Sequence, residues 1–448
     1  MTFRLQFPHP FILLLGCIAV AAMLTWVVPA GAYDRRDDSA TGRAVVVAGT
    51  YKALPASPVG VGDALAAVPR GIIDAAAIIA LVFLSGAGFT VVERTGALRA
   101  AIDGLVHRFQ SRGLLVLPAV ALVFAVGGAL IQMSEELVAF APLLLLLCAA
   151  LGVPPLMAVA MSIGTSAVAA AFSPVDPFMV TIAQKAADVP VGSGWVFRTV
   201  LLVVAVAGWL WTLRGYARAH ARPLAIAGDG PPPALGPRDL LVLTVVLATF
   251  ALFVVGAQHW AWDFDKLAML FLAMGLLTGL IGGLGLNGTA DALVQGARDM
   301  TYSALLIGVA RGIFIVLKQG NIVDTLVHAI ATPLQGLPQA AAAIGMFVAH
   351  ALIHLPVPST SGQAVLTMPV LAPVSDLVGL PRQIAVLAYQ LGAGTVELIA
   401  PTNGALLAML AATGVGLDEW LRWSLPRAVV LGLFCVGAIL LALAIGWR

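Results

Sequence analysis

Four clusters of polar residues interrupt the apolar stretches of this chain, and their side chains are the ones best suited to chemistry. Where a helix is broken, free N–H groups favour a carboxylate, and free carbonyl and hydroxyl oxygens suit a small hard cation such as Na⁺. We expect a binding site without catalytic residues. Its candidate substrate-binding residues are Ser134, Glu135, Glu136, Ser173, Asp176, Ser359, Thr360, Ser361, Gly362, Glu397, Thr402 and Asn403. Ser134, Ser173, Ser361 and Thr402 are candidate Na⁺ ligands. For any single hydroxyl, capping a helix end is an equally good interpretation.

The carboxylates in these clusters are the strongest candidates, because a charge at membrane depth is costly and usually functional. Glu135 and Glu136 are adjacent, and adjacent residues of a helix do not face the same way. At most one of them should point into the site, and the sequence does not decide which. Asp176 stands in a proline-flanked segment, where capping a turn is the alternative role. Lys185, Arg311 and Arg382 are the candidate basic partners.

His350 and His354 are spaced to share one helix face, where imidazoles can bind a metal or carry protons. A third ligand and the glutamate of a metalloprotease helix are absent from the sequence, so helix packing is the favoured interpretation. Arg311 lies within an apolar stretch, where an ion pair is favoured over contact with a substrate carboxylate. Three tryptophans flank apolar stretches and are expected at the membrane interface: Trp195, Trp420 and Trp423.

Composition defines the setting for these residues. The 448 residues are 60% hydrophobic and 10% charged, and their mean hydropathy is +1.01. Soluble domains carry about 25% charged residues, so a soluble enzyme, a disordered chain and a coiled coil are excluded. The apolar runs are long and do not alternate, which excludes an outer-membrane barrel. A net charge of +2 points to no nucleic-acid partner. A polytopic helical membrane protein remains.

The apolar stretches fall into two kinds. Seven suit a single crossing, which needs about 20 residues: 10–29, 73–92, 195–213, 239–257, 267–285, 301–317 and 426–447. Four others are longer and broken near the middle: 114–153, 156–190, 338–377 and 382–415. Irregular backbone at membrane depth survives only inside protein or beside a wet cavity. We expect two re-entrant hairpins, 114–153 and 338–377, and two broken helices, and these four segments hold the polar clusters.

A shift by half the length of the chain indicates an internal repeat. It relates Pro177 to Pro401 and Gly96 to Gly320, and it relates Arg198 to Arg422. Paired broken helices in inverted halves mark a midplane binding site. The first half is then 1–213, with a lead span at 10–29, a loop at 30–72 and repeat 1 from residue 73. A linker follows at 214–238, and the second half is 239–448, with spans 239–257 and 267–285 and repeat 2 from residue 301.

Arginines predict the orientation, because basic residues favour the cytoplasm. They gather in 93–113 and in 214–238, which contains Pro231-Pro232-Pro233. The N-terminus is then cytoplasmic, the loop 30–72 is periplasmic, and the two hairpins enter from opposite sides. The first apolar run exceeds the length of a signal-peptide core, so we expect a retained span. The expected location is the bacterial inner membrane.

The chain resembles the YfcC-type branch of the DcuC-like carriers, within the ion transporter superfamily. The resemblance runs nearly end to end and rests above all on Ser134-Glu135-Glu136, Asp176-Pro177-Phe178, Pro358 to Ala364, Leu366 to Pro369 and Pro401-Thr402. It implies an inner-membrane secondary carrier of C4-dicarboxylates or basic amino acids. It also implies a homodimer of inverted repeats with an elevator motion, and substrate with Na⁺ at the two tips and two breaks. Glu397 stands where the family pattern leads us to expect Asn. That favours a cationic substrate, a proton site or a local pair with a basic residue.

We therefore predict an all-α, inverted-repeat secondary active transporter, not an enzyme. Its expected substrates are small carboxylate-bearing metabolites, namely amino acids and basic ones among them, moved by ion coupling or exchange. A Na⁺- or H⁺-coupled C4-dicarboxylate carrier is the alternative, and a channel is less favoured. The expected partners are a small-molecule substrate, the lipid bilayer and a second copy of the chain. No cofactor is expected beyond a coupling Na⁺ or H⁺.

Overall fold

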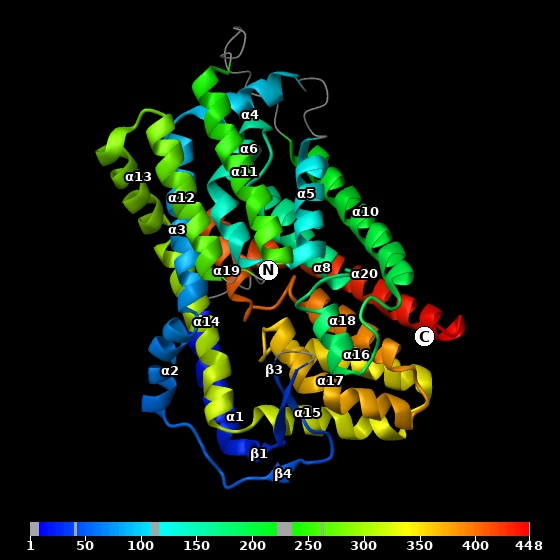
Figure 1. Cartoon of the computed structure of the whole chain (residues 1–448). Coiled ribbons are helices and arrows are strands. Elements are labelled where there is room, and N and C mark those ends of the chain that lie inside the picture. The colour runs from blue at the N-terminus through cyan, green and yellow to red at the C-terminus, as the bar shows by residue number, and fades with distance from the viewer. Residues whose placement is uncertain are drawn as a thin grey trace, which may run out of the picture.

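Figure 1 shows the computed structural model of the protein, which describes residues 9–39, 43–108, 116–221, 235–260, 262 and 264–447. Apart from four short strands, the regular structure of these residues is helical. Within them six helices are long and apolar enough to cross a membrane: Pro10–Val27, Ala76–Arg94, Trp195–His220, Phe264–Ile281, Thr301–Gln319 and Leu417–Ala444. The polytopic helical class predicted from composition is confirmed.

Up to residue 221 the helices alternate between full spans and shorter pieces. In order they are α1 (Pro10–Val27), α2 (Val61–Asp74), α3 (Ala76–Arg94), α4 (Ala97–Arg108), α5 (Val116–Ile131), the 3₁₀ segment η2 (Glu135–Phe140), α6 (Ala141–Ala150), α7 (Leu156–Val159), the π segment η3 (Ala160–Gly164), α8 (Thr165–Ala171), α9 (Val180–Ala186) and α10 (Trp195–His220). The helices α5 and α6 form the first expected hairpin. The run from α7 to α9 is the first broken helix.

From residue 235 onward the same alternation recurs. The elements are α11 (Pro237–His259), α12 (Phe264–Ile281), α13 (Gly285–Asp299), α14 (Thr301–Gln319), α15 (Val323–Ala331), the 3₁₀ segment η4 (Thr332–Gly336), α16 (Gln339–His354), α17 (Thr360–Leu377), α18 (Arg382–Val396), α19 (Gly404–Thr413) and α20 (Leu417–Ala444). Here α16 and α17 form the second hairpin, and α18 with α19 forms the second broken helix.

The element bounds repeat at the spacing noted in the sequence. A shift by half the chain length brings α3 almost exactly onto α14, and the same shift brings α5 onto α16 and α9 onto the start of α19. It also brings α2 onto α13 and α10 onto α20. In Figure 1 the hairpin α5–α6 lies in the upper half of the molecule and the hairpin α16–α17 in the lower half. The helices α8 and α19 lie between them in height.

The segment 30–72, expected as a plain loop, contains four strands and a helix. The strand β2 (Arg35–Asp38) pairs antiparallel with β3 (Arg43–Val46), and β1 (Gly31–Ala32) pairs with β4 (Lys52–Ala53). The helix α2 begins at Val61, so the loop ends earlier than predicted. Both α2 and α13 are amphipathic helices. A search of the sequence for long apolar runs does not find such helices, because only one face of each is apolar. The predicted all-α class is therefore corrected, because the protein also contains two small two-stranded sheets.

Other observed boundaries also differ from the predicted ones. The last span begins at Leu417 and not at residue 426. The prediction started too late because Asp418 and Glu419, in the first turn, make this part of the helix less apolar, although acidic residues suit a helix N-terminus. The helix α10 continues to His220, into the predicted linker. Residues 222–234 of that linker, with its three prolines, lie outside the described residues.

Close helix crossings join the two parts of the chain. The helix α2 packs on α14, and α13 packs on α3. At the first crossing a Cβ on Gly71 would lie 2.3 Å from the carbonyl oxygen of Gly308 and 2.8 Å from the amide nitrogen of Gly312. Glycine is therefore required for this backbone approach, as is common where membrane helices meet. Each part of the chain supplies a helix that supports the other.

We predict that Gly71→Ala destabilises the protein by about 1–3 kcal/mol, because overpacking forces the two backbones apart. Gly62→Ala is the matched control on the same helix, since a Cβ there meets nothing within 4 Å. Thermal unfolding in detergent should show a clear loss for Gly71→Ala and no loss for Gly62→Ala. Equal melting temperatures for the two variants would contradict this helix crossing.

Candidate functional site

The tip of the first hairpin is held by the first broken helix. The chain leaves α5 through Gln132, whose φ of 50° is left-handed. Ser166 of α8 donates its hydroxyl hydrogen to the carbonyl oxygen of Met133. The Ser134 amide donates to Oε2 of Glu136 at 3.0 Å. Glu136 is therefore buried and bound to the backbone of its own tip.

Ser173 organises the first helix break. Its hydroxyl donates to the carbonyl oxygen of Ala129 in α5 at 2.5 Å and accepts from the amides of Val175 and Asp176. Oδ1 of Asp176 accepts from the amides of the next two non-proline residues at 2.7 and 3.0 Å, which begins the turn into α9. Both side chains are fully buried. These contacts are those of caps, while Oδ2 of Asp176 has no hydrogen-bond partner within the described part of the chain.

The tip of the second hairpin reaches the first. Ser359 caps α17 by accepting from the amide of Gly362 at 3.3 Å. The Thr360 hydroxyl donates to Oε1 of Gln132 at 3.0 Å, which links the two tips. The Tyr389 hydroxyl of α18 donates to the Thr360 carbonyl at 2.7 Å. Ser361 and Gly362 lie partly buried in the first turn of α17.

The second helix break runs from Glu397 to Asn403. The Thr402 hydroxyl donates to the carbonyl oxygen of Leu355 at 2.6 Å and so ties the break to the second hairpin. Asn403 caps α19 through Oδ1, and its Nδ2 donates to the Glu397 carbonyl at 3.3 Å. The indole N–H of Trp420 donates to the Leu398 carbonyl at 2.8 Å.

A buried polar network lies behind the second hairpin tip. Nδ1 of His354 is 2.8 Å from Oε1 of Gln363, and Nε2 of His354 is 3.5 Å from Oε1 of Glu397. Nε2 of Gln363 donates to the His350 carbonyl at 2.9 Å. Both histidines are fully buried. They contact polar side chains, so simple apolar helix packing does not describe them. No group of three possible metal-ligating side chains occurs among the described residues.

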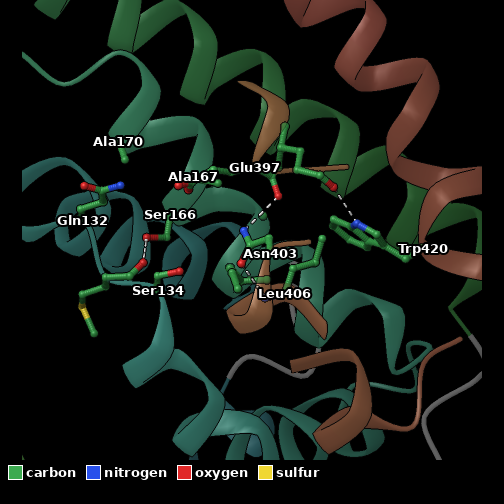
Figure 2. A pocket seen from close by; sticks show the side chains of 13 residues that line it. Gln132, Ser134, Ser166, Ala167, Ala170, Glu397, Asn403, Leu406 and Trp420 are labelled. Carbon is green, nitrogen blue, oxygen red and sulfur yellow. Dashed lines mark hydrogen bonds between the residues drawn. The ribbon is translucent and has the colours of Figure 1, made fainter. Parts of the chain in front are cut away.

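These elements surround one narrow pocket (Figure 2). Ser134 and Ser166 lie on one side of it, and Asn403 and Trp420 belong to the other. The lining residues are Gln132, Met133, Ser134, Ile163, Gly164, Ser166, Ala167, Ala170, Glu397, Leu398, Asn403, Leu406 and Trp420. They come from the first tip, both broken helices and the start of α20. Segments from distant parts of the sequence therefore meet here.

The structure brings only part of the predicted set into this pocket. Ser134, Glu397 and Asn403 line it directly. Thr360 reaches it through its bond to Gln132, whereas Ser173 and Thr402 are engaged by carbonyl groups beside it. Glu397 is the acidic side chain among these lining residues, and other carboxylates lie near it. Glu135 lies within electrostatic range of Glu136 and Glu397, and Asp176 within range of Glu397.

The two candidate arginine partners form ion pairs with other carboxylates. Arg311 forms an ion pair with Asp74, which confirms the ion-pair interpretation and places its partner outside the polar clusters. Arg382 pairs with Asp376 at 2.8 Å and with Asp188 at 3.2 Å. Neither arginine has a hydrogen bond to the carboxylates of the site among the described residues. Arg311 still acts electrostatically on Glu135, so the carboxylates near the pocket outnumber the basic groups that act on them.

Sequence reasoning missed several lining residues. Ser166 stands in a stretch of small residues that is typical of an apolar segment, and Gln132 is a neutral residue just before the Ser134-Glu135-Glu136 cluster. Trp420 is fully buried and Trp423 is 5% exposed, so their prediction as interface anchors is wrong. Because α20 begins at Leu417, both lie within the helix and pack inward. Trp195 is exposed.

The chain matches a known protein family over nearly its whole length. A family model for C4-dicarboxylate anaerobic carriers, DcuC, matches residues 7–446. The chain belongs to the DcuC family. DcuC relatives include the protein of Escherichia coli K12 named "Putative basic amino acid antiporter YfcC", which is 34% identical over 80% of this chain and 75% of that protein. An uncharacterized protein of Haemophilus influenzae is 28% identical over 98% and 97% of the two chains.

Among solved structures, the YdaH transporter of Alcanivorax borkumensis aligns over 98% of this chain and 99% of its own. The TM-score is 0.45 and the sequence identity is 18%. Membership of the DcuC family identifies the protein as a membrane transporter and confirms the resemblance noted in the sequence.

Substitutions at Asp176 can test whether its side chain stabilises the protein through hydrogen bonds to backbone amides or through its negative charge. Asp176→Asn keeps an oxygen acceptor for the amides of Phe178 and Met179, whereas Asp176→Ala removes it. We predict that Asp176→Ala loses about 1 kcal/mol of stability or somewhat more, as lost caps do. Asp176→Asn should melt near the wild type. Thermal unfolding of the three proteins makes the comparison, and equal losses in both variants would show that the charge matters instead.

Proposed function

We propose that this DcuC-family protein is an inner-membrane secondary active transporter of amino acids, basic ones among them, working by exchange or ion coupling. The observation that carries the proposal is the group of carboxylates around Glu397, which lines the pocket. Glu135 and Asp176, from two other segments, act on Glu397 electrostatically, and Arg311 acts on Glu135. A cluster in which carboxylates outnumber basic groups favours a substrate that brings positive charge.

Groups for the carboxylate of an amino acid lie at and near the same pocket. The N-terminus of α19 is at the pocket wall and that of α17 is at the neighbouring second tip, and helix N-termini favour anions. Ser134 and Asn403 add a hydroxyl and an amide at the pocket wall. A basic amino acid would place its carboxylate toward a helix end and its cationic group toward Glu397. The printed name of the Escherichia coli relative agrees with this choice of substrate.

We propose an inverted-repeat, elevator-type architecture for the movement. The repeat at half the chain length and the opposite heights of the two hairpins in Figure 1 support it. The moving part would comprise both hairpins and both broken helices, and α3 and α14 would belong to the static part. The arginines of 93–113 and 214–238 support a cytoplasmic N-terminus. A homodimer and Na⁺ ligation by Ser134, Ser173, Ser361 and Thr402 remain predictions.

A C4-dicarboxylate carrier coupled to Na⁺ or H⁺ is the second candidate, favoured by the description of the family. A dicarboxylate would add two negative charges to a site that already holds several carboxylates. It would therefore need a bound cation or protonated acids to offset the repulsion. Dependence of dicarboxylate uptake on Na⁺ or on a proton gradient would distinguish this case.

We predict that purified protein in liposomes loaded with unlabelled arginine takes up radiolabelled arginine, and that Glu397→Gln reduces this uptake about tenfold or more. The loss follows from removal of a charge-assisted hydrogen bond, worth about 1.5–3 kcal/mol. Glu93→Gln is the matched control, because Glu93 is exposed at the end of α3.

Uptake of succinate in place of arginine would favour the second candidate. Wild-type exchange in Glu135→Gln, Glu136→Gln and Glu397→Gln alike would overturn the acidic site while leaving a transporter. An ionic current without counter-transport would indicate a channel.

A further inference from the structure

The contact between His354 and Glu397 is not explained by substrate binding alone. Nε2 of His354 lies 3.5 Å from Oε1 of Glu397, and the two side chains are 1% and 14% exposed. The contact joins the end of α16 to the start of the second break. Every polar atom in such a place needs a partner, since an unpaired buried polar group is costly. The location of the hydrogen atoms therefore matters.

The hydrogen-bond network determines the tautomer of His354. A backbone carbonyl can only accept, so the Gln363 atom that lies 2.9 Å from the His350 carbonyl oxygen must be the amide nitrogen. The other Gln363 atom is then its oxygen, which faces Nδ1 of His354 at 2.8 Å. An amide oxygen can only accept, so Nδ1 must carry a hydrogen.

This assignment leaves Nε2 of His354 as the atom that faces the carboxylate. In a neutral imidazole with its hydrogen on Nδ1, Nε2 has only a lone pair. An ionised Glu397 also presents lone pairs only. Two such acceptors repel each other in a buried place, and Nε2 has no hydrogen-bond partner among the described residues. One added proton, on Nε2 or on the carboxylate, turns the repulsion into attraction.

Other titratable groups lie near this pair. His350 lies one turn earlier on α16 and acts on His354 electrostatically. Glu135 of the first tip and Asp176 of the first break act on Glu397. The helix α17 faces the histidines with Gln363 and Thr367, which are neutral.

Other titratable groups on the surrounding elements are engaged elsewhere. Tyr389 of α18 packs edge-on against His350 and donates its hydroxyl hydrogen to a backbone carbonyl. On α15, Asp324 pairs with Arg35, and His328 contacts the Tyr33 hydroxyl. On α20, Arg422 pairs with Asp418, and Arg427 donates to a backbone carbonyl. No basic side chain among the described residues other than these imidazoles is paired with Glu397.

We propose that His354 and Glu397 form a proton-binding site that exchanges its proton for the cationic group of the substrate. This inference rests on the proposed function. Glu397 also lines the pocket beside Ser134 and Asn403, so its carboxylate is shared between His354 and the pocket. An ammonium or guanidinium group that binds Glu397 takes the place of the proton, which leaves to solvent. Neutral Nδ1–H His354 and ionised Glu397 remain, and the net charge of the site is unchanged.

The first experiment counts protons. Arginine is added to the purified protein in a weakly buffered detergent solution, and proton release is compared with bound arginine. Linkage predicts about one proton released per arginine bound by the wild type. Glu397→Gln and His354→Gln should release about none, because neither pair can hold the exchangeable proton. The matched controls are Glu93→Gln and His220→Gln, which alter exposed residues and should behave as the wild type. Stoichiometric arginine binding without proton release by the wild type would overturn the exchange.

The second experiment needs no ligand. Nitrogen NMR of the histidine rings, with His354→Gln used to assign the His354 signals, reports which nitrogen atoms carry hydrogen. We expect a hydrogen on Nδ1 and a strongly hydrogen-bonded or protonated Nε2, a pattern that Glu397→Gln should change. A hydrogen on Nε2 with a bare Nδ1 would overturn the proton site. If arginine does not bind at all, the proposed function fails together with the exchange, and the ring state alone decides whether the proton site exists.

Discussion

A helix that stops inside an apolar protein leaves amide and carbonyl groups without partners, and this chain stops helices there at four places. Water cannot supply those partners at membrane depth, so side chains must. Ser173 bonds a carbonyl of α5, Thr402 bonds a carbonyl at the end of α16, and Gln390 of α18 bonds the carbonyl of Ser173 at 2.6 Å. Each break is closed by a segment distant in sequence. The site therefore exists only when both parts of the chain are folded together.

The same bonds already occupy hydroxyl groups near the pocket. A hydroxyl has one hydrogen and two lone pairs. Ser173 uses its hydrogen on Ala129 and its lone pairs on two amides, so its hydrogen-bonding capacity is filled. Ser134 and Asn403 stand at the pocket wall. Asn403 uses Oδ1 on the Leu406 amide and one Nδ2 hydrogen on the Glu397 carbonyl, which leaves it a second Nδ2 hydrogen and a second oxygen lone pair. In the proposed function, recognition of a substrate falls to those side chains, to helix ends and above all to the carboxylates.

Charge decides what such a pocket favours. Two arginines were candidate partners for the carboxylates of the site. Arg311 instead forms an ion pair with Asp74, and Arg382 forms ion pairs with Asp188 and Asp376. With those cations engaged elsewhere, Glu397 has His354 as its neighbour, and the two share a proton in our proposal. A site that balances its own acid with an exchangeable proton is suited to trade that proton for a substrate cation. The departure from the expected Asn at this position thereby acquires a chemical role.

The sequence by itself determined the membrane class, the hairpins, the broken helices and the repeat spacing, because long apolar runs and their interruptions are local properties of the chain. It did not reveal α2, α13 or the strands after α1, because amphipathic and short segments resemble loops by composition. Only the tertiary structure decided which side chains meet. Ser166, Gln363 and Trp420 acquire their roles from partners in other segments of the chain, and hydrogen-bond direction depends on that geometry. The pairing of His354 with Glu397 is of this kind, because the sequence around each residue gives no sign that the other lies beside it.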